Sequence, residues 1–204
     1  ALGTDPDRLE IVIMQLVNIV EAGEQKQMSK RRGEFITLDD LVAEVGVDAT
    51  RWFMLSRSHD TAVDLDLDLA KRESSENPVY YVQYAHARIS SILAKAGEER
   101  VDAALAAAGR VPRVALEPAE RVLVKKLLSF PEELADAAEK RAPHRITVYA
   151  LELAQTFTAF YRDCQVVGAE GEGVEDLRLA LCVASQTTIA SALGLLGVTA
   201  PTSM

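Results

Sequence analysis

The sequence predicts a mostly α-helical protein, in which a helical bundle follows a short region of strand, loop and helix. Two observations support this prediction. From residue 70 onward, apolar residues recur at helical spacing in successive segments, which is typical of helices that pack in a bundle. Near the start, by contrast, residues 10–21 ("EIVIMQLVNIVE") form a run of β-branched and apolar residues. Such a run indicates a buried strand of a mostly parallel sheet.

Two helices are expected after this strand. A turn ("EAGEQ") and a loop ("MSKRRGEF") come first, because the charges of the loop lack periodicity and Gly33 interrupts any regular element. Thr37 and Asp40 have the spacing of a capping box, so a helix should begin there, and Gly46 should end it. The segment "VDATRWFMLSRS" predicts a second helix, with Asp48 as its N-cap.

Within residues 59–69 ("HDTAVDLDLDL"), leucine or valine alternates with aspartate from Val63 to Leu69. The alternation predicts an extended linker with one half-buried face. Because the pattern becomes helical afterwards, we place the domain boundary here, with residues 1–69 in one unit and residues 70–204 in the next.

The rest of the chain predicts a bundle of about five helices. Two long segments, residues 77–97 and 144–164, show this most clearly, because each carries an apolar stripe at 3.6-residue spacing. The stripe residues are Val82, Ala85, Ile89, Ile92, Leu93 and Ala96 in the first segment, and Ile146, Ala150, Leu153, Phe157, Phe160 and Cys164 in the second.

Composition restricts the functions that this chain can have. It has 204 residues and a formal net charge of −9, which argues against a broad electrostatic surface for DNA or RNA, so any nucleic-acid contact should be local. No segment approaches the roughly 20 uninterrupted apolar residues of a membrane span, and no signal peptide opens the chain. The two cysteines and three histidines lack the spacing of metal ligands. We therefore expect a cytoplasmic protein with reduced thiols, without a metal site and without a DNA or membrane partner.

Four basic residues gather in the loop "EQKQMSKRRGEF", which stands out in an acidic chain. A loop that follows a buried parallel strand and holds serine, lysine, arginine and glycine suits a polyanion such as a triphosphate. Lysine supplies a point charge on a flexible stem that can follow phosphates as charge develops. The alternative is a solvated charge cluster without a ligand.

This loop resembles the KMSKS loop of class I aminoacyl-tRNA synthetases. The following "GEFITLDDLVAEVGVDATRWFMLSRS" and "NPVYYVQYAHAR" resemble arginyl-tRNA synthetases in particular. The resemblance implies that Lys30 is the catalytically important lysine. It also implies that the loop residues bind ATP phosphates; these are Met28, Ser29, Lys30 and Arg31. Two positions depart from the family pattern, because Gln27 replaces a lysine and Arg31 replaces a serine.

The same resemblance implies how the chain is organised. The His-x-Gly-His sequence of class I enzymes is absent. We therefore expect a C-terminal fragment, with the last strand, loop and helices of a truncated Rossmann-like catalytic domain followed by a helical anticodon-binding domain. The full enzyme would activate L-arginine with ATP and Mg and transfer it to tRNA(Arg). The fragment alone would be inactive and would hold no tightly bound cofactor. A stand-alone helical interaction module and another class I ligase, such as a cysteinyl enzyme, are the alternatives.

Aromatic residues on the helix at 77–97 are the candidates for RNA contact. Tyr81, Tyr84 and Arg88 fall on one flank, away from the apolar stripe, and exposed tyrosines beside an arginine can stack on splayed bases. Alternatively, the tyrosines cap neighbouring helices and Arg88 forms an ion pair. Four further residues complete the predicted tRNA-binding set: Tyr80, Gln83, Tyr161 and Met204.

Overall fold

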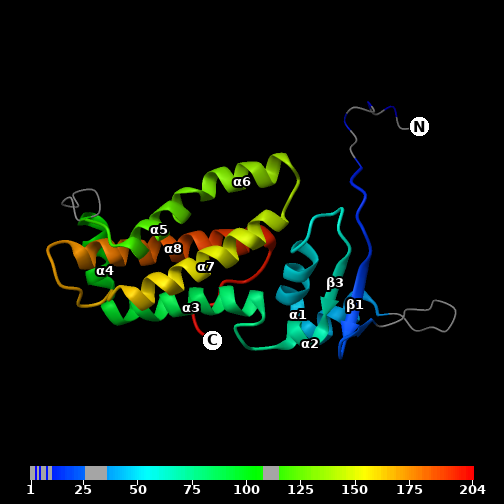
Figure 1. The fold of residues 1–204 in the computed structure, drawn as a ribbon, viewed down its shortest axis with the longest axis horizontal. Helices are drawn as coiled ribbons and strands as arrows, with labels where there is room; N and C mark the ends of the chain where they lie inside the picture. Colours follow the sequence, from blue (N-terminus) through cyan, green and yellow to red (C-terminus); the bar gives the residue numbers. More distant parts are fainter. Residues whose placement is uncertain (1–2, 4, 6–7, 9–10, 26–35, 108–114) are drawn as a thin grey trace.

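The computed structural model describes residues 3, 5, 8, 11–25, 36–107 and 115–204. A small three-stranded sheet with two helices forms one end of the molecule, and a long bundle of helices forms the other (Figure 1). A cluster of buried apolar side chains extends through both parts, from Ile19 in the sheet to Val198 after the last helix. The fold is therefore mostly α-helical, as the sequence predicts.

The sheet is built around β1 (Val17–Glu21), which lies between β2 (Glu24–Gln25) and β3 (Val63–Asp66). β1 pairs with β3 in parallel and with β2 antiparallel. The predicted strand at 10–21 is thus correct only in its second half. Residues 11–16 are outside the strand, and five of these six are large apolar residues with exposed side chains: Ile11, Val12, Ile13, Met14 and Leu16.

The alternation within residues 59–69 is real, but the expectation that this segment is a linker between two domains is wrong. Val63 and Leu65 are buried, as an extended half-buried segment requires, but the segment is β3 of the same sheet rather than a connection to the next domain. α2 (Leu67–Lys71) follows at once and is capped by the carboxylate of Asp66, which accepts from the backbone N–H of Leu69 at 3.0 Å. The proposed boundary after residue 69 therefore falls inside this short helix.

α1 (Leu38–Leu55) contains both helices predicted for this region. Thr37 and Asp40 form the expected capping box. Gly46 separates the two helical segments, because its φ of 82° and ψ of 164° lie outside the helical region. The carboxylate of Asp48, predicted to cap the second segment, makes a tertiary contact that the sequence did not indicate. It accepts hydrogen bonds from Gln83 and Thr199.

Six helices follow in the part of the chain that the structure describes, against about five expected from the sequence. Both predicted apolar stripes lie in the core of the bundle. The helices are α3 (Pro78–Ala96), α4 (Glu98–Ala107), α5 (Pro118–Leu128), α6 (Phe130–Glu139), α7 (His144–Asp163) and α8 (Val174–Leu196).

α8 is the central helix of the bundle. By length and composition alone it is the one described helix that could cross a membrane, and core helices of soluble proteins share that length and composition. α8 packs against α3, α4, α5 and α7, and Cys182 within it is a buried free thiol. Its apolar composition is explained by these neighbours.

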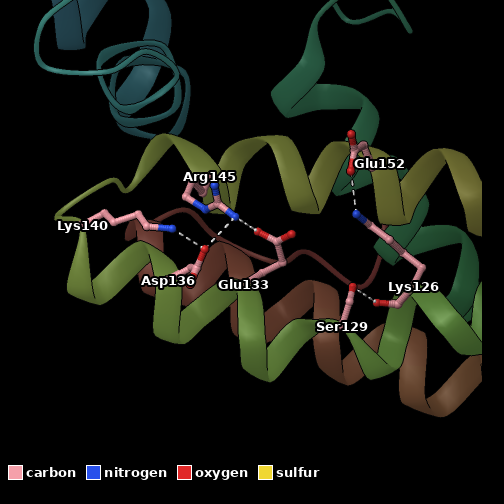
Figure 2. Close-up of polar contacts among 7 residues, drawn as sticks. All are labelled: Lys126, Ser129, Glu133, Asp136, Lys140, Arg145 and Glu152. Atoms are coloured by element: carbon pink, nitrogen blue, oxygen red, sulfur yellow. Dashed lines mark hydrogen bonds and ion pairs between the residues drawn. The ribbon is translucent and has the colours of Figure 1, made fainter.

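Ion pairs fasten the outer helix α6 to α7 (Figure 2). The guanidinium of Arg145 lies 2.7 Å from the carboxylate of Glu133 and 3.3 Å from that of Asp136. Lys140 pairs with Asp136 at 2.6 Å and holds the pKa of that carboxyl below its ordinary value, with a smaller contribution from Arg145. The ion pairs of Arg145 link side chains of the two helices, so this cluster stabilises their packing.

Candidate nucleic-acid interface

A groove on one side of the bundle brings together four of the predicted RNA-binding residues. Tyr84 and Arg88 come from α3, Tyr161 comes from α7 and Met204 ends the chain. The groove has a volume of about 430 Å³. Its other lining residues are Ala87, Ser91, Ile92, Lys95 and Ser203.

Arg88 is the central side chain of this groove. Its guanidinium carbon lies 5.6 Å from the ring centre of Tyr84 and 5.3 Å from that of Tyr161, which is within the range of cation–π attraction. The two rings are 43% and 37% exposed. The groove therefore offers solvent two aromatic surfaces with a cation between them.

Both tyrosine rings are held by a second aromatic ring. Tyr84 stacks on Tyr80, with ring centres 6.3 Å apart and planes within 9° of each other. Tyr161 stacks on Phe157 in the same geometry, and Phe157 is fully buried. Rings supported in this way lose less conformational freedom when a flat ligand stacks on them.

The charge of the groove is positive, although the chain as a whole is acidic. Arg88 and Lys95 are both exposed, and no aspartate or glutamate is among the described residues that line the groove. Aromatic rings, cations and hydroxyl groups (Ser91 and Ser203) are the combination that binds unstacked bases and the phosphates between them.

Tyr81 does not face this groove, contrary to the expectation that it shares a flank with Tyr84 and Arg88, and neither does Gln83, another candidate on α3. Tyr81 is half-buried, and its hydroxyl donates a hydrogen bond to Thr158 Oγ1 at 3.2 Å, so it packs between α3 and α7. Side chains three residues apart on a helix differ in direction by about 60°. Tyr81 therefore faces further toward the core than Tyr84. Gln83 is 9% exposed and donates to Asp48 Oδ2 at 2.8 Å.

Sequence reasoning missed the contribution of Lys95 to the groove. Lys95 follows Arg88 by seven residues on α3, with Ser91 between them, so the pattern that predicted one flank of this helix also extends to it. Ser203 gave no comparable indication, because its place depends on how the chain returns after α8.

The predicted phosphate-binding residues Met28, Ser29, Lys30 and Arg31 lie outside the described part of the chain. Their assignment stays a prediction. Tyr80 lies beside the groove rather than in it, and reaches it through the stacked ring of Tyr84.

Comparison with known proteins agrees with the family resemblance. The model of the DALR anticodon binding domain matches residues 82–204. An arginine–tRNA ligase of Desulforudis audaxviator (strain MP104C) is 50% identical over 206 residues, which cover 100% of this chain but 36% of the ligase. The chain thus spans little more than a third of the length of the curated relatives that it matches.

Solved structures show the same relation. A structure from Campylobacter jejuni assigned to the arginyl-tRNA synthetases has a TM-score of 0.84 and 35% identity, covering 100% of this chain and 43% of that chain. The arginyl-tRNA synthetase of Thermus thermophilus has a TM-score of 0.63 and 32% identity, covering 86% of this chain and 29% of that chain. With its helical bundle and the match over residues 82–204, this chain belongs to the family of the DALR anticodon binding domain.

Proposed function

We propose that the chain is the C-terminal part of an arginine–tRNA ligase, and that its groove binds the anticodon loop of tRNA(Arg). The observation that carries this proposal is the position of Arg88 between two exposed, supported tyrosine rings. Base stacking on aromatic side chains, with phosphates held by arginine, is how proteins bind single-stranded RNA loops. The relatives are arginine–tRNA ligases, which favours this enzyme over a cysteinyl ligase or a stand-alone interaction module.

The exposed apolar run at residues 11–16 supports the idea that more protein belongs against the sheet. Isolated exposed apolar residues are ordinary, but five within six positions are typical of a surface that another part of a protein covers. We propose that the chain up to the end of α2 is the edge of the catalytic domain, that this domain covers the run, and that the bundle from α3 onward forms the anticodon-binding domain.

The full enzyme would act in the cytoplasm, activate arginine with ATP in the presence of Mg and transfer it to tRNA(Arg). Lys30 would bind the triphosphate with Met28, Ser29 and Arg31, because a lysine point charge can stabilise phosphates as charge develops in the transition state. We expect Lys30→Ala in the full-length ligase to lower kcat far more than the affinity for tRNA. Equal losses in both quantities would instead give Lys30 a role in RNA binding.

The RNA-binding groove can be tested with the chain described here and an anticodon stem-loop of tRNA(Arg). Tyr84→Ala and Arg88→Ala should each weaken binding about tenfold or more, because a stacked base contributes about 1–3 kcal/mol. Fluorescence anisotropy of a labelled stem-loop measures this affinity.

Two variants are matched controls for this experiment. Tyr81→Phe removes a hydroxyl that bonds to Thr158 within the bundle, and Arg121→Ala removes an exposed arginine of α5 that does not line the groove. Both should bind the stem-loop like the unmodified chain. If the controls weaken binding as much as Tyr84→Ala and Arg88→Ala do, the groove is not the binding site.

A further inference from the structure

The chain after α8 runs back to α3 (Figure 1). This tail, residues 198–204, has no helix or strand of its own. Its last two residues, Ser203 and Met204, line the groove, and Met204 is exposed there. The position of these two residues therefore depends on what holds the tail upstream.

Three hydrogen-bonded points hold the tail. The N–H of Val198 donates to the carbonyl of Leu193 at 2.9 Å, which ends α8. Thr199 is bound on both its backbone and its side chain, and the carbonyl of Pro201 lies 2.8 Å from Nδ1 of His86 on α3. These contacts all precede Ser203 in the chain, so the segment before Ser203 places the groove-lining end.

The carboxylate of Asp48 is the centre of this attachment. Its Oδ1 accepts from the backbone N–H of Thr199 at 3.1 Å, and its Oδ2 accepts from Gln83 Nε2 at 2.8 Å. The hydroxyl of Thr199 also donates to Oδ2. The same Gln83 amide donates to the carbonyl of Thr199 at 3.0 Å. Asp48 thus joins three segments distant in sequence: α1, α3 and the tail.

Arg51, on the same helix as Asp48, packs on the residue just before the tail. A Cβ atom added to Gly197 would lie 2.7 Å from the guanidinium of Arg51, so Arg51 packs directly on the residue that ends α8. Asp48 and Arg51 are three residues apart and therefore share one face of α1. The first residue of "DATR" therefore contacts the tail, and the last contacts Gly197 at the end of α8.

We propose that Asp48 is a positioning residue for the RNA-binding groove. It fixes Thr199, and thereby places Met204 beside Tyr84, which directly follows Gln83 on α3. This role rests on the proposed function of the groove. It also gives the "DATR" segment a structural role in the groove, although α1 belongs to the part of the chain that we assign to the catalytic domain. The groove is then completed by a residue of that part without direct contact to RNA.

A double-mutant cycle tests this proposal with the whole chain. Asp48→Asn keeps the shape of the side chain but loses its charge, and a charge-assisted hydrogen bond is strong enough that affinity for the anticodon stem-loop should fall about tenfold. In a Met204→Ala background the same substitution should have less than about a twofold effect, because the group that it positions is already gone. Hydrogen exchange at the amide of Thr199 should become faster in Asp48→Asn in both backgrounds.

Asp39→Asn is the matched control, since Asp39 is an exposed residue of α1 in the first turn, distant in sequence from the tail contact. It should leave both affinity and exchange unchanged. If Asp48→Asn lowers the fraction of folded chain, as judged by far-UV circular dichroism, Thr199→Val replaces it in the cycle, because it removes one hydroxyl at an exposed position.

Two results would overturn the proposal. Equal losses of affinity with and without Met204 would mean that Asp48 does not act through the tail. Unchanged exchange at Thr199 in Asp48→Asn would mean that Asp48 does not hold the tail. Failure of the unmodified chain to bind the stem-loop would overturn the proposed function itself, and the exchange measurement would still decide whether Asp48 fixes Thr199.

Discussion

The carboxylate of Glu120 shows how much a single buried charge can matter in this bundle. Its side chain is 1% exposed and lies 2.6 Å from the guanidinium of Arg178, which is itself 13% exposed. The second carboxylate oxygen accepts from the backbone N–H of Glu117 at 2.8 Å and so caps α5. One residue therefore joins α5 to α8 and begins a helix.

We expect Glu120→Ala to lower the free energy of unfolding by about 3 kcal/mol or more, because removing one partner of a buried pair leaves the other without its counter-charge. Urea unfolding followed by circular dichroism measures the loss. Glu132→Ala, at an exposed position of α6, is the control and should change stability by less than about 0.5 kcal/mol. A similar small change in Glu120→Ala would show that the pair contributes little.

At the scale of elements, local sequence patterns predicted the helices well but did not predict which strands pair with each other. Thr37 and Asp40 predicted a helix start because a capping box is formed entirely by residues three apart. The alternation at residues 63–66 correctly predicted which side chains are buried. It could not show that this segment pairs with β1, because residues about 46 positions apart form that contact and nothing in either segment specifies the other.

Two glycines should respond in opposite ways to replacement by alanine. Gly46 has a backbone conformation that is almost restricted to glycine, so Gly46→Ala should destabilise the chain by about 1–3 kcal/mol, although no atom obstructs the new methyl group. Gly194 is helical and also has open space around it, so Gly194→Ala should stabilise by about 0.5–1 kcal/mol. Thermal and urea unfolding of both variants check the signs. A stabilising Gly46→Ala would contradict the break that we see in α1.

Glu175 at the start of α8 should make the free energy of unfolding depend on pH. Glu175 accepts a hydrogen bond from the N–H of Gly168 and pairs with Arg100, and both contacts hold its pKa below the ordinary value. Because the folded-state pKa is lowered, this stabilisation is present above the unfolded-state pKa and is lost as pH falls through the folded-state value. Glu175→Gln should therefore be less stable than the unmodified chain at pH 7, and the difference should shrink toward pH 2. A constant difference across unfolding curves from pH 7 to pH 2 would argue against this linkage.

At the scale of the whole molecule, an acidic chain carries a small positive groove. The sequence predicted this local character, and four of its seven RNA-binding candidates meet in the groove: Tyr84, Arg88, Tyr161 and Met204. It did not predict that Tyr81 and Gln83 are covered, because helical spacing gives the flank of a helix but not which neighbouring helix or tail lies against that flank. The tail contact of Gln83 joins residues 116 positions apart, which no local pattern can indicate.

The charge distribution also predicts how binding depends on salt. A net charge of −9 disfavours non-specific contact with phosphates, so few phosphate contacts should accompany stacking. We expect the slope of log K against log salt for the anticodon stem-loop to correspond to fewer than about six phosphate contacts. A steeper slope in titrations at several salt concentrations would indicate a broad electrostatic surface instead of the groove.

The central claim is that this groove reads the anticodon loop of tRNA(Arg). The most direct measurement compares the affinity of the chain for two stem-loops that are identical except for the anticodon, one of tRNA(Arg) and one of another tRNA. The account predicts that the tRNA(Arg) stem-loop binds about tenfold or more tightly, as base stacking and hydrogen bonding allow, and that Arg88→Ala removes most of this preference. Equal affinity of the unmodified chain for the two stem-loops would contradict it.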